Sequence, residues 1–143
     1  MGSNADTWLN QLQEQGYRLT AARRTVVEII ANSLRALTPL EVYQIAKKRH
    51  PGLGLVSVYR TLEMLHELNL VQRVHQEDGC NAYLPGMQGH QHLLICEQCG
   101  RAEYFEGDDL EALFAQLARQ YGYHIQGHWL QISGVCPQCQ KQP

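Results

Sequence analysis

Four cysteines in this sequence stand in two pairs, and each pair has the spacing of a metal knuckle. Cys96 and Cys99 lie in "CEQC", and Cys136 and Cys139 lie in "CPQC". A C-x-x-C turn presents two thiolates to one ion, and two such turns complete the tetrahedral four-thiolate shell of a structural zinc. The amino terminus carries no export signal, which favours metal binding over disulfides. The spacing therefore predicts one structural Zn²⁺ held by all four thiolates.

The two pairs lie far apart in the sequence, with 36 residues between Cys99 and Cys136. A zinc ion that joins them would close a long loop and contribute folding free energy directly. Cys80, the fifth cysteine, lies outside both pairs. In a hairpin strand we expect it to be a small apolar residue rather than a ligand.

Histidines and one carboxylate form a second candidate metal set. In "HQH", His90 and His92 point to the same side if the segment is extended, because strand side chains alternate. Glu111 falls in the first turn of a predicted helix, and His124 and His128 share one face of a predicted strand. Three imidazoles and a carboxylate suit zinc and also accept iron(II), manganese or cobalt. Spacing alone does not choose between His124 and His128, and any one histidine alone is more often an ordinary polar residue.

The charge of the chain divides into a basic half and an acidic half. The net charge is -2, but Lys and Arg exceed Asp and Glu by three in residues 1–75, whereas the acids exceed the bases by five in residues 76–143. Such an asymmetry favours a nucleic-acid-binding module joined to a different module. The chain has 143 residues, 44% of them hydrophobic, and no apolar run of membrane-spanning length, so we expect a globular cytoplasmic protein.

Helical signals dominate the first half. A helix is predicted over 7–15, and we leave the first four residues out of the fold prediction. Thr20 is a predicted N-cap for a helix over 20–34, and Thr38, Pro39 and Glu41 form the start signal of the next helix as N-cap, first residue and capping-box partner. The inner face predicted for the helix over 20–34 consists of Val26, Val27, Ile29, Ile30 and Leu34.

A fourth helix and a hairpin complete this half. Ser57 is the predicted N-cap, and Val58, Leu62, Leu65 and Leu68 face inward. Strands follow over 70–76 and 80–84, with Asp78 and Gly79 at the turn.

Helices followed by a hairpin are typical of a winged helix-turn-helix. In that arrangement the last helix enters the major groove, where Tyr59 can contact a thymine methyl and Arg60 can bind guanine or phosphate. Ser57, Tyr59 and Arg60 are therefore candidate DNA-binding residues, although a solvent-facing pair of this kind is often ordinary surface.

The second half predicts a strand, a helix and a strand between the cysteine pairs. The segments are 101–106, 108–121 and 123–133. A β-α-β excursion of this kind returns the chain to its starting point, so the second knuckle can meet the first. The helix places its apolar residues on one face, with Leu110 as a predicted core residue; they are Leu110, Leu113, Phe114, Leu117 and Tyr121.

Five segments in one order resemble a known family over nearly the whole chain. The sequence resembles the ferric uptake regulator (Fur) family of metal-dependent bacterial transcriptional repressors. The segments are "GYRLTAAR" at 16–23, "SVYRTLEML" at 57–65, "LVQRV" at 70–74, "HQHLLICEQCG" at 90–100 and "GVCPQC" at 134–139.

This resemblance implies an α+β fold in three parts: a winged-helix DNA-binding domain over 1–84, a hinge over 85–89, and an α/β metal-binding dimerisation domain over 90–143. It also implies a homodimer that binds a double-stranded DNA operator. By the same resemblance, Ser57, Tyr59 and Arg60 contact the operator and Arg23 is a candidate phosphate contact.

The resemblance also sorts the histidines. One regulatory metal site of similar proteins maps onto His90, His92, Glu111 and His128, and this set is complete here. A second site of the family maps onto positions that hold no ligand in this chain, which argues against a peroxide-sensing role. These positions are Ala36, Leu84, Gln91, Leu93 and Tyr104.

The resulting hypothesis is a metal-activated repressor, not an enzyme. It binds a pseudo-palindromic operator when Zn²⁺ or Fe²⁺, with Mn²⁺ as a further possibility, fills the regulatory site. One alternative is a zinc hydrolase in which His90, His92 and His128 leave an open coordination position and Glu111 serves as general base. Another is a metal-storage or zinc-dependent interaction module that does not bind DNA. The sequence names neither the sensed metal nor the operator.

Overall fold

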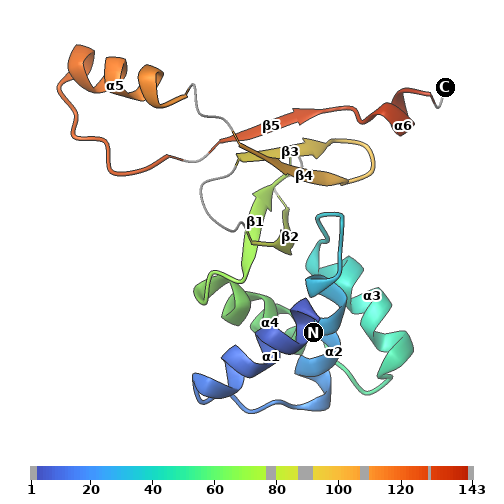
Figure 1. Cartoon of the computed structure of the whole chain (residues 1–143). Coiled ribbons are helices and arrows are strands. Elements are labelled where there is room, and N and C mark those ends of the chain that lie inside the picture. Colours follow the sequence, from blue (N-terminus) through green and yellow to red (C-terminus); the bar gives the residue numbers. More distant parts are fainter. Residues whose placement is uncertain (1–2, 77–79, 87–91, 107–109, 129, 142–143) are drawn as a thin grey trace. The chain divides into compact units, whose positions relative to one another are not determined.

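The computed structural model describes residues 3–76, 80–86, 92–106, 110–128 and 130–141. The chain forms two compact units, Met1–Gly86 and Met87–Pro143. The first unit holds four helices and a hairpin: α1 (Asn4–Glu14), α2 (Ala21–Ala31), α3 (Pro39–Arg49), α4 (Leu55–Glu67), β1 (Val71–His75) and β2 (Asn81–Pro85) (Figure 1). The second holds β3 (His92–Cys96), β4 (Ala102–Phe105), α5 (Leu110–Tyr121), β5 (Gln131–Gly134) and α6 (Pro137–Gln140).

The predicted start signals of α2 and α3 are confirmed. The backbone N–H of Arg23 donates to Thr20 Oγ1 at 3.2 Å. In α3, Glu41 N–H donates to Thr38 Oγ1 at 3.2 Å, and Thr38 N–H donates to Glu41 Oε1 at 3.0 Å. These bonds satisfy backbone donors that have no partner within the helix, so local sequence sets both helix starts.

The predicted start of α1 and the predicted end of α2 are wrong. Helix α1 begins at Asn4 rather than at residue 7, because Ser3 caps it in a capping box and Ala5 is buried in the core. Helix α2 ends at Ala31, so Leu34 lies beyond it and is 82% exposed instead of facing inward.

The predicted cap of α4 is also wrong. The helix begins at Leu55 with Gly54 as N-cap, and no side chain caps it. Ser57 instead lies within the first turn, half-buried, and its carbonyl accepts a hydrogen bond from Thr61 Oγ1 at 2.7 Å. Gly54 adopts the extended conformation that a cap position needs, so the helix can start before the first available hydroxyl. One consequence is that Val56 belongs to the first turn of α4.

The core of the first unit lies between its helices and the hairpin. Val58, Leu62 and Leu65 of α4 are fully buried, as predicted, against apolar residues of α1 and α2. Strands β1 and β2 pair antiparallel, and Leu37 extends the hairpin by a bridge in which its N–H donates to the Tyr83 carbonyl at 2.8 Å. The predicted turn at Asp78 and Gly79 lies outside the described residues.

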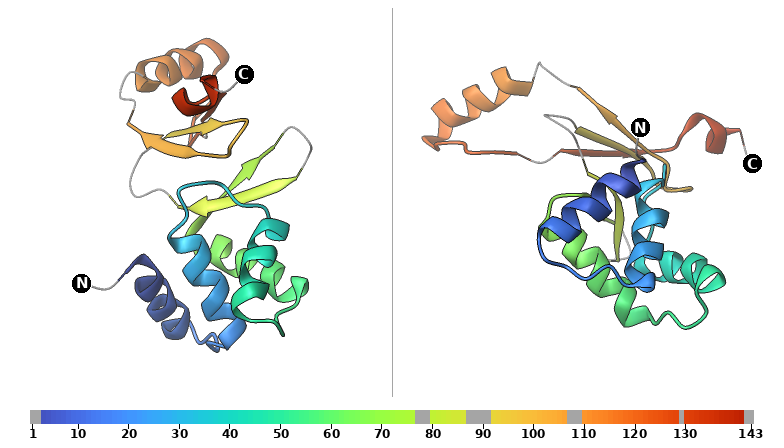
Figure 2. Two further views of the ribbon diagram at one scale, coloured as in Figure 1. Left: turned by 90° about the vertical axis from the view of Figure 1, so that its right-hand side faces the viewer. Right: turned by 60° about the horizontal axis from the view of Figure 1, so that its bottom comes forward.

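The second unit contains a three-stranded sheet in the order β4-β3-β5 (Figure 2). Strand β3 pairs antiparallel with β4 and parallel with β5, so α5 lies in the crossover that the β-α-β pattern predicts. The predicted strand over 123–133 is too long, because β5 starts only at Gln131. Gln131 pairs with Leu93 near the start of β3, and a strand needs a partner to extend its ladder.

Helix α5 leaves its apolar face uncovered in the single chain. Leu113, Leu117 and Tyr121 are exposed, and no described residue of this helix is fully buried. The prediction of Leu110 as a core residue is therefore wrong, since its side chain is only half-buried. Within the described part of the chain, no helix has the length and apolar character needed to cross a membrane.

Candidate metal centres and nucleic-acid interface

The four paired cysteines converge on one point in the second unit. Cys96 ends β3, Cys99 follows it in a turn, and Cys136 and Cys139 lie at the start of α6 and within it. Their four Sγ atoms all lie within 4.8 Å of one another. Four sulfurs bound to one zinc at ordinary distances lie about 3.8 Å apart, and Cys99 Sγ and Cys136 Sγ are 3.8 Å apart. The donor set therefore fits a structural zinc.

Backbone hydrogen bonds hold the first knuckle against the sheet. Gly100 takes a positive φ of 76° and donates its N–H to the Cys96 carbonyl at 3.0 Å. The N–H of Glu97 donates to the carbonyl of Gly134, the last residue of β5, at 2.8 Å. Because β5 leads directly into the second knuckle, this pairing brings the two C-x-x-C turns together.

The surroundings of the cysteines shift the pKa values of their thiols in different directions. The backbone N–H of Cys136 donates to Cys96 Sγ at 3.3 Å and, with further backbone donors, lowers the pKa of the Cys96 thiol to about 6. A backbone hydrogen bond at Cys139 lowers the pKa of Cys136. The side-chain hydrogen bond to Cys136, together with burial, raises the pKa of Cys139 to about 12. A divalent cation would therefore find one thiolate already formed and would have to displace a proton from another.

Cys80 does not belong to this cluster. Its sulfur is not among the four that converge, in agreement with the expectation that it is not a ligand. It is exposed and lies just before β2 rather than within the strand.

The histidine set is partly brought together. His92 in β3 is 2% exposed, and its ring centroid lies 5.2 Å from that of His128. Two phenylalanines flank this pair: Phe105 lies 5.5 Å from His92, and Phe114 lies 4.4 Å from His128. Phe105 is the strand partner of His92, so the contact follows from the β3–β4 register. Sequence spacing alone did not reveal this aromatic surround.

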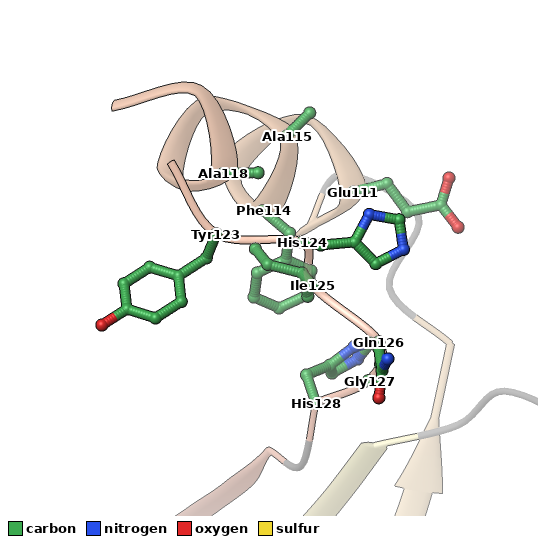
Figure 3. Close-up of a pocket in the computed structure, with 10 residues that line it drawn as sticks. All are labelled: Glu111, Phe114, Ala115, Ala118, Tyr123, His124, Ile125, Gln126, Gly127 and His128. Carbon is green, nitrogen blue, oxygen red and sulfur yellow. The ribbon is translucent and has the colours of Figure 1, made fainter. Parts of the chain in front are cut away.

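Glu111 and His128 line the same cavity, of about 550 Å³, beside α5 (Figure 3). His124 also lines it, from the segment that follows the helix. His90 lies outside the described residues. Among the described residues, three or more ligand atoms come within 4.8 Å of one another only at the four cysteines. The described members of the set are thus related in pairs, His92 with His128 through their rings and Glu111 with His128 through the cavity, without the close convergence that the cysteines show.

The predicted DNA-binding side chains differ in accessibility. Tyr59 and Arg60 are exposed on α4, whereas Ser57 is half-buried. Arg23 is half-buried, and its Nη1 donates to the Arg18 carbonyl at 2.7 Å. This bond uses one of the five N–H donors that a guanidinium carries.

A winged-helix unit followed by a four-cysteine α/β unit defines a class of protein: regulators that combine DNA binding with metal binding. Residues 14–133 match the profile of the "Ferric uptake regulator family". The chain is 33% identical over 143 residues to the ferric uptake regulation protein of Bacillus subtilis, with 97% of this chain and 96% of the relative covered.

Solved structures show the same architecture. The ferric uptake regulator of Helicobacter pylori, described as having three functional metal binding sites, superimposes with a TM-score of 0.75 at 20% identity, covering 99% of both chains. A zinc-bound manganese uptake regulator superimposes with a TM-score of 0.70 at 28% identity, covering 90% of this chain and 98% of that one.

The chain belongs to the ferric uptake regulator family. It is a metal-responsive DNA-binding transcriptional regulator and not an enzyme, with the α+β fold predicted from the sequence. The hydrolase and storage-module alternatives are thereby set aside. Members of the family bind DNA operators and typically form dimers.

Proposed function

We propose that this protein is a repressor that binds its operator as a homodimer when a divalent metal, zinc by ligand preference, occupies His90, His92, Glu111 and His128. The observation that carries this proposal is the contact between His92 and His128, with ring centroids 5.2 Å apart. Glu111 borders the same cavity as His128. A site with three imidazoles and one carboxylate favours zinc, although it also accepts iron(II) and manganese.

The second metal site of the family offers no competing place for the ion. Ala36, Leu84 and Leu93 occupy three of its positions, and all three are buried apolar side chains. Burial raises the pKa of Tyr104 at a fourth position to about 12, so its phenol stays protonated at neutral pH. Gln91, at the fifth, lies outside the described residues. These side chains support regulation through the histidine set rather than peroxide sensing.

The surface of α4 supports the proposed operator contacts. Tyr59 and Arg60 are exposed on the helix that precedes the hairpin, and a winged helix places that helix in the major groove. Arg23 can hold a phosphate beside it. The exposed apolar face of α5 suits a homodimer, in which a second copy would cover Leu113, Leu117 and Tyr121.

Regulation requires the metal-loaded conformation to be the one that binds DNA. His92 lies on β3, Glu111 lies in the first turn of α5, and His128 follows α5, so joint ligation would fix three segments of the second unit. A coupling free energy of about 1–3 kcal/mol between the metal and DNA sites changes operator affinity about 5- to 150-fold.

Metal-dependent operator binding tests the proposal. A His90→Ala/His128→Ala double variant is compared with wild-type protein in titrations with buffered zinc, iron(II) and manganese. We expect the double variant to keep its cysteine-bound zinc and to lose the metal dependence of DNA binding. His124→Ala is the matched control, because His124 lines the same cavity but lies outside the proposed set. Unchanged metal dependence in the double variant would refute the proposal.

A further inference from the structure

The first turns of α4 expose a group of apolar side chains. Val56 is 63% exposed and Tyr59 is 48% exposed. They stand three residues apart, so they are neighbours on one face of the helix. Leu55 beside them is 37% exposed. A single exposed valine needs no explanation. A cluster of exposed apolar side chains at the N-terminus of the proposed recognition helix suggests a binding surface.

The polar residues of α4 indicate what this surface can approach. The exposed Arg60 lies next to the apolar cluster, whereas the exposed acids Glu63 and Glu67 follow toward the carboxyl end. A polyanion would repel the acidic end and accept the end that carries Arg60. The apolar side chains are therefore on the part of the helix that fits a nucleic acid.

We propose that Val56 determines operator sequence by contacting the 5-methyl group of a thymine in the major groove, beside the base contacted by Tyr59. The inference rests on the proposed role of α4 as the recognition helix and adds a base contact to it. A thymine is the only base that presents a methyl group in the major groove, so an aliphatic side chain can distinguish it from the other three. A half-buried Ser57 is less able to make such a contact than the exposed side chain that precedes it.

The experiment uses the metal-loaded full chain and an operator selected from random duplexes with the wild-type protein. Each thymine of one half-site is replaced in turn by deoxyuridine, which removes the methyl group and keeps the hydrogen-bonding pattern. At one position we expect affinity to fall about 4-fold for wild-type protein, the effect of one buried methyl group. Val56→Ala should bind the unmodified operator at least about 10-fold more weakly and should no longer distinguish thymine from deoxyuridine there.

Two further variants show whether the effect belongs to the methyl groups of Val56. Leu34→Ala removes an exposed apolar side chain outside α4 and should leave every affinity unchanged. Val56→Thr keeps the branched shape, replaces one methyl group by a hydroxyl, and should show intermediate discrimination. Alanine is a good helix former, and Val56 is mostly exposed, so thermal melting of Val56→Ala should match that of wild-type protein.

The possible failures are distinct. If Val56→Ala keeps the wild-type response to deoxyuridine while Tyr59→Ala abolishes binding, the inference about Val56 is overturned and the role of α4 stands. If neither substitution changes operator binding, both are overturned. If Val56→Ala instead alters the oligomeric state without DNA, the surface contacts a second copy of the chain and the inference is likewise overturned.

Discussion

Replacement of one knuckle cysteine should unfold the second unit and leave the first intact. The perturbation is Cys99→Ser, which removes a thiolate whose Sγ lies 3.8 Å from that of Cys136. A serine hydroxyl stays protonated at neutral pH and is a poor zinc ligand, so the shell loses one of its four donors.

The second unit has a small apolar core, so its free energy of unfolding without zinc is expected to be low. Its buried apolar residues, among those described, are Leu93, Ile95 and Cys96, and α5 contributes none. A domain of about 60 residues has a net stability of only ~6 kcal/mol even with an ordinary core. A structural zinc contributes about 10–16 kcal/mol in small domains. Loss of most of that binding free energy exceeds the stability available, so the unit should unfold.

The two tryptophans allow each unit to be followed separately. Trp8 belongs to the first unit, where it is buried, and Trp129 belongs to the second. In a Trp129→Phe background, emission from Trp8 should show an unchanged thermal transition after Cys99→Ser. Circular dichroism should show the loss of secondary structure from the second unit, and elemental analysis should show one zinc fewer per chain.

Cys80→Ser is the matched control, because Cys80 is exposed and outside the cluster. It should change neither zinc content nor melting. The reasoning would be refuted by a Cys99→Ser protein that retains its zinc and melts like wild-type protein.

Three further predictions concern helix capping, pH and DNA. Thr38→Ala removes the hydroxyl of the α3 capping box, which accepts from the Glu41 N–H at 3.2 Å and donates to Glu41 Oε1 at 3.0 Å. The first unit should lose about 1 kcal/mol of stability, lowering its Tm by roughly 4–8 °C in calorimetry; an unchanged Tm would contradict it. Stabilisation from the Cys96 thiolate is complete above its ordinary pKa of 9.0 and is lost as the pH falls through about 6. Because protons compete with zinc for the thiolates, zinc release followed with a chromogenic chelator should increase as the pH falls, and equal zinc retention at about pH 5 and about pH 8 would contradict this. Arg60→Ala should weaken operator binding. If Arg60 contacts phosphate, the slope of the logarithm of the binding constant against the logarithm of the salt concentration should become shallower by about 1. Weaker binding with an unchanged slope would indicate a base contact instead.

Several elements follow from short stretches of sequence. The capping box at Thr38 and Glu41 is local, so its residues specify the start of α3 without reference to the rest of the fold. The inward face of α4 follows from the helical period, since Val58, Leu62 and Leu65 recur on one side. Helix limits were less predictable, because Ser3 and Gly54 act as caps only in the backbone conformation that the folded chain gives them.

The sequence by itself determined which residues can bind metal: two C-x-x-C pairs and a group of histidines have that chemistry wherever the chain places them. Only the tertiary structure decided which of them meet. The return of β5 alongside β3 joins cysteine pairs that 36 residues separate. The β3–β4 register and the path of the chain after α5 place His128, rather than His124, against the ring of His92. Spacing could not make that choice, because contacts between distant segments depend on strand pairing and packing rather than on the order of residues.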